Sequence, residues 1–415
     1  MKSIKKELTA ATCTLLSQHP GSALALENAW EIDSSYLRYS EADDRVTVNK
    51  YTVKAGGDVS DRDRVNLTAV LDTMSGSTPS GAVKQSTPGF TGASGGGGGG
   101  STESNADALA KFDDTRTGLS LSWTHSHDNN WEMVYGGAIS VENDYRSYTG
   151  SVVVNKDIHQ KATRLTLGVA GTTDEVFRVG DGNTPVPLSP IGAGLFYGQG
   201  EKDTVDVIAG ITRVINRRTL GQLNLSYSVS NGYLTDPYKV FSVVDINSDI
   251  AYDSFYESRP SSRERTSITG HINHQTYPAN NIINASYRYY TDDWDVDSHT
   301  FQIGYQLTMK DTKYWEPRIR LYHQTAAFFY QNEYFAEVDG NPNAPSIPDS
   351  FPEFISADYR LDEFYSVTPE LQFGTEIGGD DHLRMRVAYM YQEFKNSEFD
   401  TNKAAIFQIA YNKRF

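Results

Sequence analysis

The chain has 415 residues but little of what a large soluble domain or a helical membrane protein needs. No stretch reaches the roughly 18 consecutive apolar residues of a transmembrane helix, which excludes a helical membrane protein. Only 38 % of the residues are hydrophobic and the mean hydropathy is −0.51, too little for a large oily core. The net charge of −16, without a Lys/Arg-rich stripe, excludes nucleic acid as a partner.

Cysteine is nearly absent, since Cys13 is the one in the sequence, and it lies in a segment that resembles a secretory signal peptide. Lysines precede a short apolar stretch over residues 8–16, and residues 23–25 match the A-x-A cleavage pattern. A cytosolic amphipathic start is the alternative. We expect residues 1–25 to be removed, which leaves a mature chain without cysteine. The residues around Cys13 do not form a lipoprotein signal.

Alternating apolar and polar residues recur along the whole mature chain, whereas helical periodicity does not. The predicted strands number about sixteen, and an even number is typical of single-chain bacterial barrels. The sequence therefore predicts an all-β fold, a transmembrane antiparallel β-barrel over residues 26–415. The strands are predicted at 29–38, 45–55, 63–74, 115–126, 130–142, 146–156, 162–172, 203–214, 219–230, 262–274, 280–290, 297–308, 313–324, 362–376, 382–393 and 405–415.

Four long connections follow the third, seventh, ninth and thirteenth strands, at 75–114, 173–202, 231–261 and 325–361. All four therefore lie on one side of the predicted barrel, and the opposite side has short turns. Outer-membrane barrels have short periplasmic turns and long extracellular loops. The segment 75–114 contains GASGGGGGGST, which predicts a flexible extracellular loop.

Aromatic residues mark both ends of the predicted strands, as expected for the two girdles of a bilayer-spanning barrel. The final segment, AAIFQIAYNKRF, is a strand that ends on an aromatic residue. It resembles the terminal signature read by the barrel assembly machinery, which implies insertion among the lipids of a Gram-negative outer membrane. The periplasmic girdle is predicted at Trp30, Trp123, Trp131, Trp315 and Phe415, and the opposite girdle at Tyr36, Tyr148, Tyr227, Tyr287 and Tyr289.

Charged residues at alternate strand positions predict the inner wall of the barrel. Neighbouring strands place arginine, glutamate and arginine side by side, where opposite charges can pair. Two interpretations stay open and are compatible: a salt-bridged network that stiffens the wall, or a wall that also selects anions. The predicted pore-lining residues are Arg263, Arg265, Arg288, Glu316, Arg318, Arg320, Glu370, Glu376, Arg384 and Arg386.

The acidic hairpin TDDWDVDSH is the one candidate metal site. Asp292, Asp293, Asp295 and Asp297 offer oxygen ligands for Ca²⁺, although a solvated acidic turn is the alternative and the EF-hand glycine and glutamate are missing. We predict no other cofactor. The histidine groups HSH (125–127) and HINH (271–274) lack the spacing of a metal or Ser-His-acid site. We therefore predict no catalytic residues and no enzymatic activity.

Several motifs resemble a family of bacterial proteins catalogued as domain of unknown function 3570. GYLTDPYK followed by ESRP and RYYTDDW is the most specific combination, and the resemblance spans nearly the whole chain. The motifs are SSYLRYSEADDRV (34–46), RRTLGQLNLSYSVSNGYLTDPYKVFSVVD (217–245), YESRPSSRERTS (256–267), SYRYYTDDWDVDSHT (286–300) and SADYRLDEF (356–364).

The resemblance implies an outer-membrane barrel without an established substrate. Its members look like neighbours of flavin-transfer and thioredoxin-like genes, which implies a redox or export system. Two hypotheses follow for the function. The first is a channel for small polar or anionic solutes. The second is a scaffold that holds a periplasmic or surface protein partner, with its lumen plugged by the loop 231–261 or filled by another subunit.

Overall fold

The computed structural model describes residues 30–43, 45–82, 109–180, 182–247, 249, 251–309, 312–337, 351–378 and 381–415. The predicted signal peptide, residues 1–25, lies outside these ranges. So does the middle of the predicted flexible loop 75–114, namely residues 83–108. No helix in the described ranges is long and apolar enough to cross a membrane.

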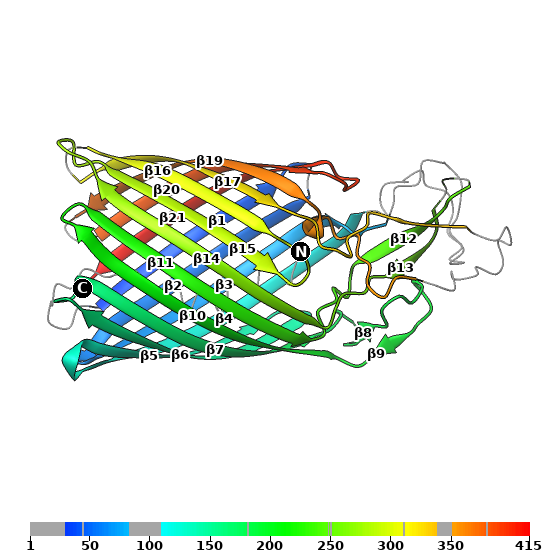
Figure 1. Cartoon of the computed structure of the whole chain (residues 1–415), viewed down its shortest axis with the longest axis horizontal. Coiled ribbons are helices and arrows are strands. Elements are labelled where there is room, and N and C mark those ends of the chain that lie inside the picture. Colours follow the sequence, from blue (N-terminus) through cyan, green and yellow to red (C-terminus); the bar gives the residue numbers. More distant parts are fainter. Residues whose placement is uncertain are drawn as a thin grey trace.

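Sixteen antiparallel strands of the described chain close into one barrel, which confirms the predicted fold and strand number (Figure 1). The first and last barrel strands pair with each other, from Glu31 opposite Arg414 to Glu41 opposite Ala404. This pairing removes the open sheet edges. The barrel strands are β1 (Trp30–Glu41), β2 (Val46–Ser60), β3 (Asp63–Pro79), β4 (Leu109–His127), β5 (Trp131–Val141), β6 (Tyr145–Ile158), β7 (Thr163–Val176), β10 (Gly200–Asn216), β11 (Thr219–Gly232), β14 (Ser262–Gln275), β15 (Ile282–Asp292), β16 (Ser298–Thr308), β17 (Tyr314–Gln324), β19 (Phe364–Ile377), β20 (Asp381–Phe394) and β21 (Thr401–Arg414).

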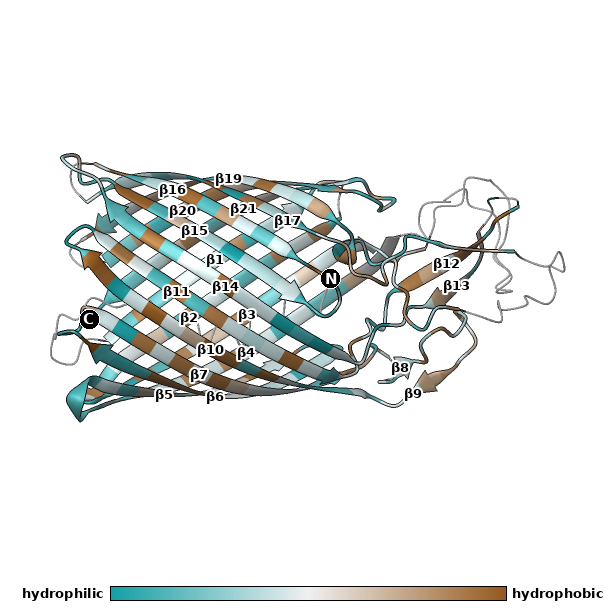
Figure 2. Cartoon of the chain, in the orientation of Figure 1, coloured by the Kyte–Doolittle hydropathy of each residue, from teal (hydrophilic) through white to brown (hydrophobic). Residues whose placement is uncertain are grey.

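Alternation along each strand separates an apolar outer face from a polar inner face (Figure 2). Leu121, Leu167 and Val205, for example, are 52 %, 59 % and 52 % exposed on the outside of the wall. Such exposure of apolar side chains suits contact with lipid and would be costly in water. The low average hydropathy of the chain therefore comes from the inner face and the loops.

The two ends of the barrel differ as the sequence predicts. Connections at the end that holds the C-terminus are short, and the four long ones all extend from the opposite end (Figure 1). Trp30, Trp123, Trp131 and Trp315 lie at the short-turn end and are 40–44 % exposed on the outer face. These positions match a periplasmic aromatic girdle.

The long connections carry secondary structure of their own beyond the barrel. They contain β8 (Thr184–Pro185) paired with β9 (Phe196–Tyr197), and a sheet of β13 (Ala251–Tyr256), β12 (Val240–Asp245) and β18 (Tyr334–Ala336). The short 3-10 turn η2 (Tyr359–Leu361) follows β18, whereas η1 (Asp128–Asn130) lies in the short β4–β5 turn at the other end of the barrel. The β12–β13 hairpin projects past the long-loop end of the barrel (Figure 1). The middle of the predicted plug, residues 231–261, pairs with β18 beyond the barrel (Figure 1), and the plug itself stays a prediction.

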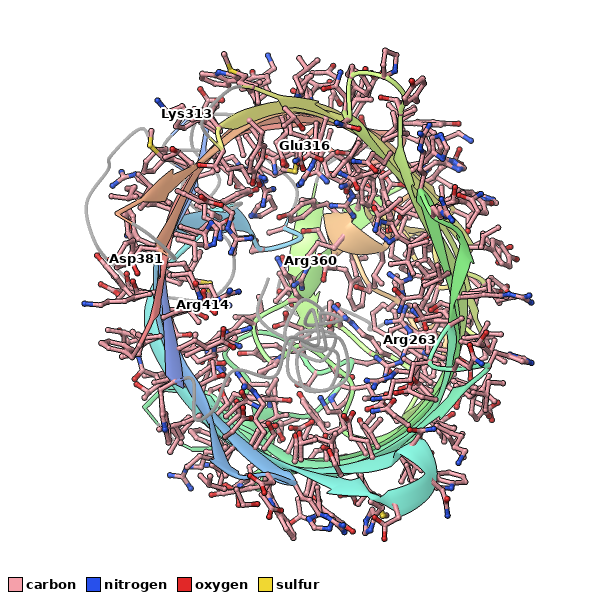
Figure 3. The ribbon with its side chains drawn as sticks, turned by 90° about the vertical axis from the view of Figure 1, so that its left-hand side faces the viewer. Arg263, Lys313, Glu316, Arg360, Asp381 and Arg414 are labelled. Atoms are coloured by element: carbon pink, nitrogen blue, oxygen red, sulfur yellow. The ribbon has the colours of Figure 1, made fainter. Side chains whose placement is uncertain are left out.

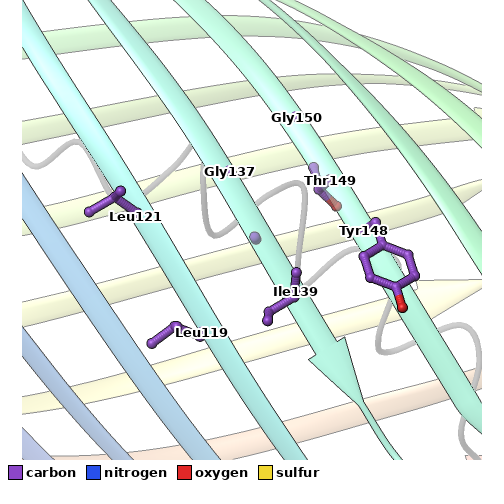
Figure 4. A pocket seen from close by; sticks show the side chains of 8 residues that line it. Leu119, Leu121, Gly137, Ile139, Tyr148, Thr149 and Gly150 are labelled. Atoms are coloured by element: carbon purple, nitrogen blue, oxygen red, sulfur yellow. The ribbon is translucent and has the colours of Figure 1, made fainter.

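A shallow apolar groove crosses the outer wall where glycines leave space between larger side chains (Figure 4). Gly137 of β5 and Gly150 of β6 are partners in register, and both belong to the groove. A Cβ atom added at either glycine would meet nothing within 4 Å. The groove is bordered by Leu119, Leu121, Ile139 and Tyr148.

Replacement by alanine is expected to lower the stability of the barrel at one glycine of the wall and to leave it almost unchanged at another. Gly150→Ala adds a methyl group in open space, so the free energy of unfolding should change by no more than about 0.5 kcal/mol. Gly76 has a φ of 127°, and an added Cβ would lie 1.7 Å from the carbonyl oxygen of Arg45. Gly76→Ala should therefore cost about 1–3 kcal/mol or more. Denaturant unfolding in detergent checks this, and equal stability of the two variants would contradict it.

Candidate functional site in the barrel lumen

The strand register places all ten predicted pore-lining residues on the inner face of the wall. Figure 3, a view along the barrel from the short-turn end, shows Glu316 and Arg263 inside the ring of strands. The prediction that they line a pore stays a prediction. Their contacts divide them into paired and unpaired groups.

Glu370 of β19 joins two arginines from the strands on either side of it. Its Oε1 lies 3.1 Å from Nη1 of Arg318, and its Oε2 lies 2.7 Å from Nε of Arg386. Arg318 also donates to Glu316, which is 1 % exposed, at 2.7 Å. Two cations thus face two carboxylates. We call Glu316, Arg318, Glu370 and Arg386 the Glu370 network, and its formal charge is zero.

A second ion pair lies nearer the long-loop end, between Arg263 and Asp292. Nε of Arg263 donates to Oδ2 of Asp292 at 2.8 Å, and the guanidinium stacks on Trp294 at 4.1 Å from the ring centre. The side chain of Asp292 also accepts the N–H groups of Trp294 and Val296 at 3.0 and 2.9 Å. Asp292 therefore belongs to the inner wall and to the turn that follows it.

This placement corrects the predicted grouping of four aspartates around Ca²⁺. Asp293 accepts the N–H of Glu264 at 2.9 Å, and Asp297 accepts the hydroxyl of Tyr289 at 3.0 Å. The four carboxylates therefore do not converge on one point, because successive residues of the strand and turn point in different directions. Ca²⁺ binding at this turn is not proposed.

A buried acidic group that the sequence did not reveal lies near the long-loop end of β4. Asp114 of β4 and Glu142 and Asp144 of the β5–β6 turn bring carboxylate oxygens within 4.8 Å of one another. All three are at least 94 % buried. Spacing in sequence does not indicate this group, because it forms only when β4 and β5 pair.

Three arginines of the predicted inner wall make no ion pair with a carboxylate in the described ranges: Arg288, Arg320 and Arg384. Arg265 donates to the hydroxyls of Ser228 and Ser230, at 2.8 and 2.6 Å. The lumen wall on this side therefore carries positive charge that its own carboxylates do not cancel.

A buried ionic cluster, which we call the cap cluster, lies above the wall in the long connections. It has three cations and three anions, and it joins segments that are about a hundred residues apart in sequence. Arg259 lies 2.7 Å from Glu257 and 2.9 Å from Asp358, and Arg360 lies 3.0 Å from Asp236. Figure 3 shows Arg360 within the ring of strands. The cluster consists of Asp236, Lys239, Glu257, Arg259, Asp358 and Arg360.

The cap cluster consists of residues from the motifs GYLTDPYK, ESRP and SADYRLDEF. Burial alone would raise the pKa of Asp358, but Arg360, Lys239 and Arg259 hold this pKa well below its usual range. The Asp358 carboxylate is therefore ionised at all ordinary pH values. An ionised, fully buried carboxylate is stable only while its cationic partners stay in place.

Apolar contacts attach the cap cluster to the barrel. Tyr359 packs against Phe364 of β19 and Phe394 of β20, and Leu361 belongs to a second apolar group around Trp294. From β17, Nε2 of Gln324 donates to the carbonyl oxygens of Arg360 and Asp362, both at 2.9 Å. The segment around η2 is thus fixed to the inner wall at the mouth of the barrel.

Comparison with solved structures finds bacterial receptors and a secretin at low identity. The siderophore receptor PirA from Pseudomonas aeruginosa is 8 % identical with a TM-score of 0.43, covering 90 % of this chain and 57 % of the receptor. A mutant ferric enterobactin receptor, PfeA, from the same organism is 10 % identical with a TM-score of 0.44, covering 89 % and 54 %. This chain thus spans little more than half the length of these receptors.

A bacterial polysaccharide outer membrane secretin is 9 % identical with a TM-score of 0.44, covering 94 % of this chain and all of the secretin chain. No curated protein sequence matches the chain. The profile of the family described as "Protein of unknown function (DUF3570)" matches residues 5–408. That match covers nearly the whole sequence and confirms the predicted family, so the chain belongs to the DUF3570 family.

Proposed function

We propose that this protein is a channel of the Gram-negative outer membrane that favours small anionic solutes. The observation that carries the proposal is the set of unpaired arginines Arg288, Arg320 and Arg384, which face the lumen without a carboxylate partner in the described chain. Fixed positive charge in a narrow aqueous passage concentrates anions and repels cations. Lipid of the outer membrane and the barrel assembly machinery are the partners that this proposal requires.

Reversal potentials in planar bilayers at low salt test the proposal. Wild-type protein should give conductance steps with anions more permeant than cations. The triple variant Arg288→Gln, Arg320→Gln, Arg384→Gln should lower the anion-to-cation permeability ratio about fivefold or more, because three lumen charges are lost. A matched control removes three cations from short turns instead: Arg62→Gln, Arg217→Gln, Arg218→Gln.

The anion channel is supported if the anion-to-cation permeability ratio changes little in the control and falls strongly in the triple variant. Equal changes in the two variants would contradict it. The second candidate is a scaffold that does not conduct, and it is favoured by the buried cap cluster at the mouth of the barrel. Closed membranes in the presence of correctly inserted wild-type protein would favour the scaffold and exclude the channel.

A further inference from the structure

Two of the unpaired arginines lie on either side of one strand. Arg288 of β15 is the register partner of Thr300 of β16, and Arg320 of β17 is the partner of Gln302 of β16. Neighbouring strands lie about 4.8 Å apart, so β16 places one hydroxyl and one amide between two guanidinium groups.

Each guanidinium lies near the ring of a tyrosine that is two residues further along the same face of its strand. Arg288 lies 5.3 Å from the ring centre of Tyr290, and Arg320 lies 5.9 Å from that of Tyr322. An aromatic ring contacts the flat face of a guanidinium, whereas the N–H donors lie along its edge. A cation–π contact of this kind therefore leaves the edge donors of both groups available to a ligand.

The charged groups on both sides of this pair already have partners within the wall. Toward the short-turn end lies the Glu370 network, with formal charge zero. Toward the long-loop end, Arg263 pairs with Asp292, and Arg265 of β14 donates to serine hydroxyls. His271 of β14 is the other titratable group that this strand turns inward. No carboxylate of these elements cancels the two charges of Arg288 and Arg320.

We propose that Arg288 and Arg320, with Thr300 and Gln302 between them, form a binding site for a tetrahedral oxyanion of the phosphate class. This inference rests on the proposed anion channel, to which it adds a stationary site and a ligand class. Arginines on opposite sides need a ligand with acceptor oxygens on both sides, which phosphate and sulfate have and chloride lacks. Thr300 donates a further hydrogen bond from the wall, and Gln302 offers both a donor and an acceptor.

Calorimetric titration of the folded full-length barrel with inorganic phosphate tests the site. Wild type should bind phosphate saturably, and Arg288→Gln with Arg320→Gln should weaken binding about tenfold or more. Arg384→Gln, which removes a lumen arginine outside the site, should leave phosphate binding within about twofold. Sulfate should compete with phosphate, and chloride at equal ionic strength should not.

A conservative double variant separates a loss of phosphate binding from a loss of folding. Arg288→Lys with Arg320→Lys keeps both charges but removes the forked donors, so it should still weaken phosphate binding severalfold. No saturable binding in wild type, equal binding in the glutamine variant, or equal displacement by chloride would overturn the site. If one of these results is found while the wild-type protein still conducts anions selectively, the binding site is overturned and the proposed channel is not. Phosphate binding lost on substitution, in a barrel that does not conduct, would support the site and overturn the channel.

Discussion

Replacing Asp358 with asparagine is expected to release the cap cluster from the mouth of the barrel. The side chain of Asp358 is fully buried and contacts both Arg259 and Arg360. Removing its charge leaves two buried guanidinium groups with too few anions, which typically costs about 3–5 kcal/mol. The barrel strands do not depend on this pairing, so the variant should still insert. Limited proteolysis of the η2 segment, compared between wild type and variant, measures the release.

Glu363 offers a matched control five residues along the same segment. It pairs with Lys395 at 2.8 Å, and the Lys395 side chain is 62 % exposed to solvent. Such an exposed pair contributes little to stability. Glu363→Gln should therefore leave the proteolysis rate close to that of wild type. Equal protection of the Asp358 and Glu363 variants would show that the cap cluster does not fix the segment.

The lowered pKa of Asp358 also predicts how this carboxylate responds to acid. A carboxyl group whose folded-state pKa is depressed stabilises the fold above its unfolded pKa of about 3.9, and loses this contribution as the pH falls through the folded value. Because that folded pKa is well below the usual range, mild acid does not protonate Asp358. The cap of the wild-type protein should thus stay protected near pH 5, unlike the cap of the asparagine variant.

The sequence predicted the barrel well because the information for strands is local. Alternation along β17 separates Trp315, Ile319 and Leu321 from Glu316 and Arg318 without knowledge of any other strand. The side on which long connections lie follows from counting strands. Each of these inferences needs only neighbouring residues and the fixed two-residue period of a strand.

The contacts of the candidate site needed the structure because they depend on register and on distant segments. Arg384 and Arg386 have the same parity in β20, yet only Arg386 pairs with Glu370 in the described chain. The cap cluster unites Glu257 with Arg259 and Asp358 across about a hundred residues. The motifs GYLTDPYK, ESRP and SADYRLDEF were visible in the sequence, but nothing local indicated that their charges meet.

Glu370→Gln is expected to shift ion selectivity in the direction opposite to that of the arginine variants. In wild type, Glu370 contacts Arg318 and Arg386 at 3.1 and 2.7 Å, and together with Glu316 it neutralises them. The neutral glutamine adds one net positive charge to the lumen wall. At a distance of about 8 Å in water, one charge changes the energy of an ion by about 0.5 kcal/mol, roughly twofold in local concentration. The local concentration of anions rises and that of cations falls by this factor. The anion-to-cation permeability ratio should therefore rise.

Glu376→Gln is the matched control, because it removes an inward carboxylate that makes no ion pair with an arginine in the described chain. Both variants add one net positive charge, but only Glu370→Gln also frees the guanidinium of Arg386 to contact a passing anion, since Arg318 stays paired with Glu316. Reversal potentials at low salt should therefore shift further for Glu370→Gln than for Glu376→Gln, and the difference should shrink at high salt as screening shortens to about 3 Å at 1 M. Equal shifts would mean that the Glu370 network does not mask its arginines, and a shift toward cations would contradict an anion-selective wall.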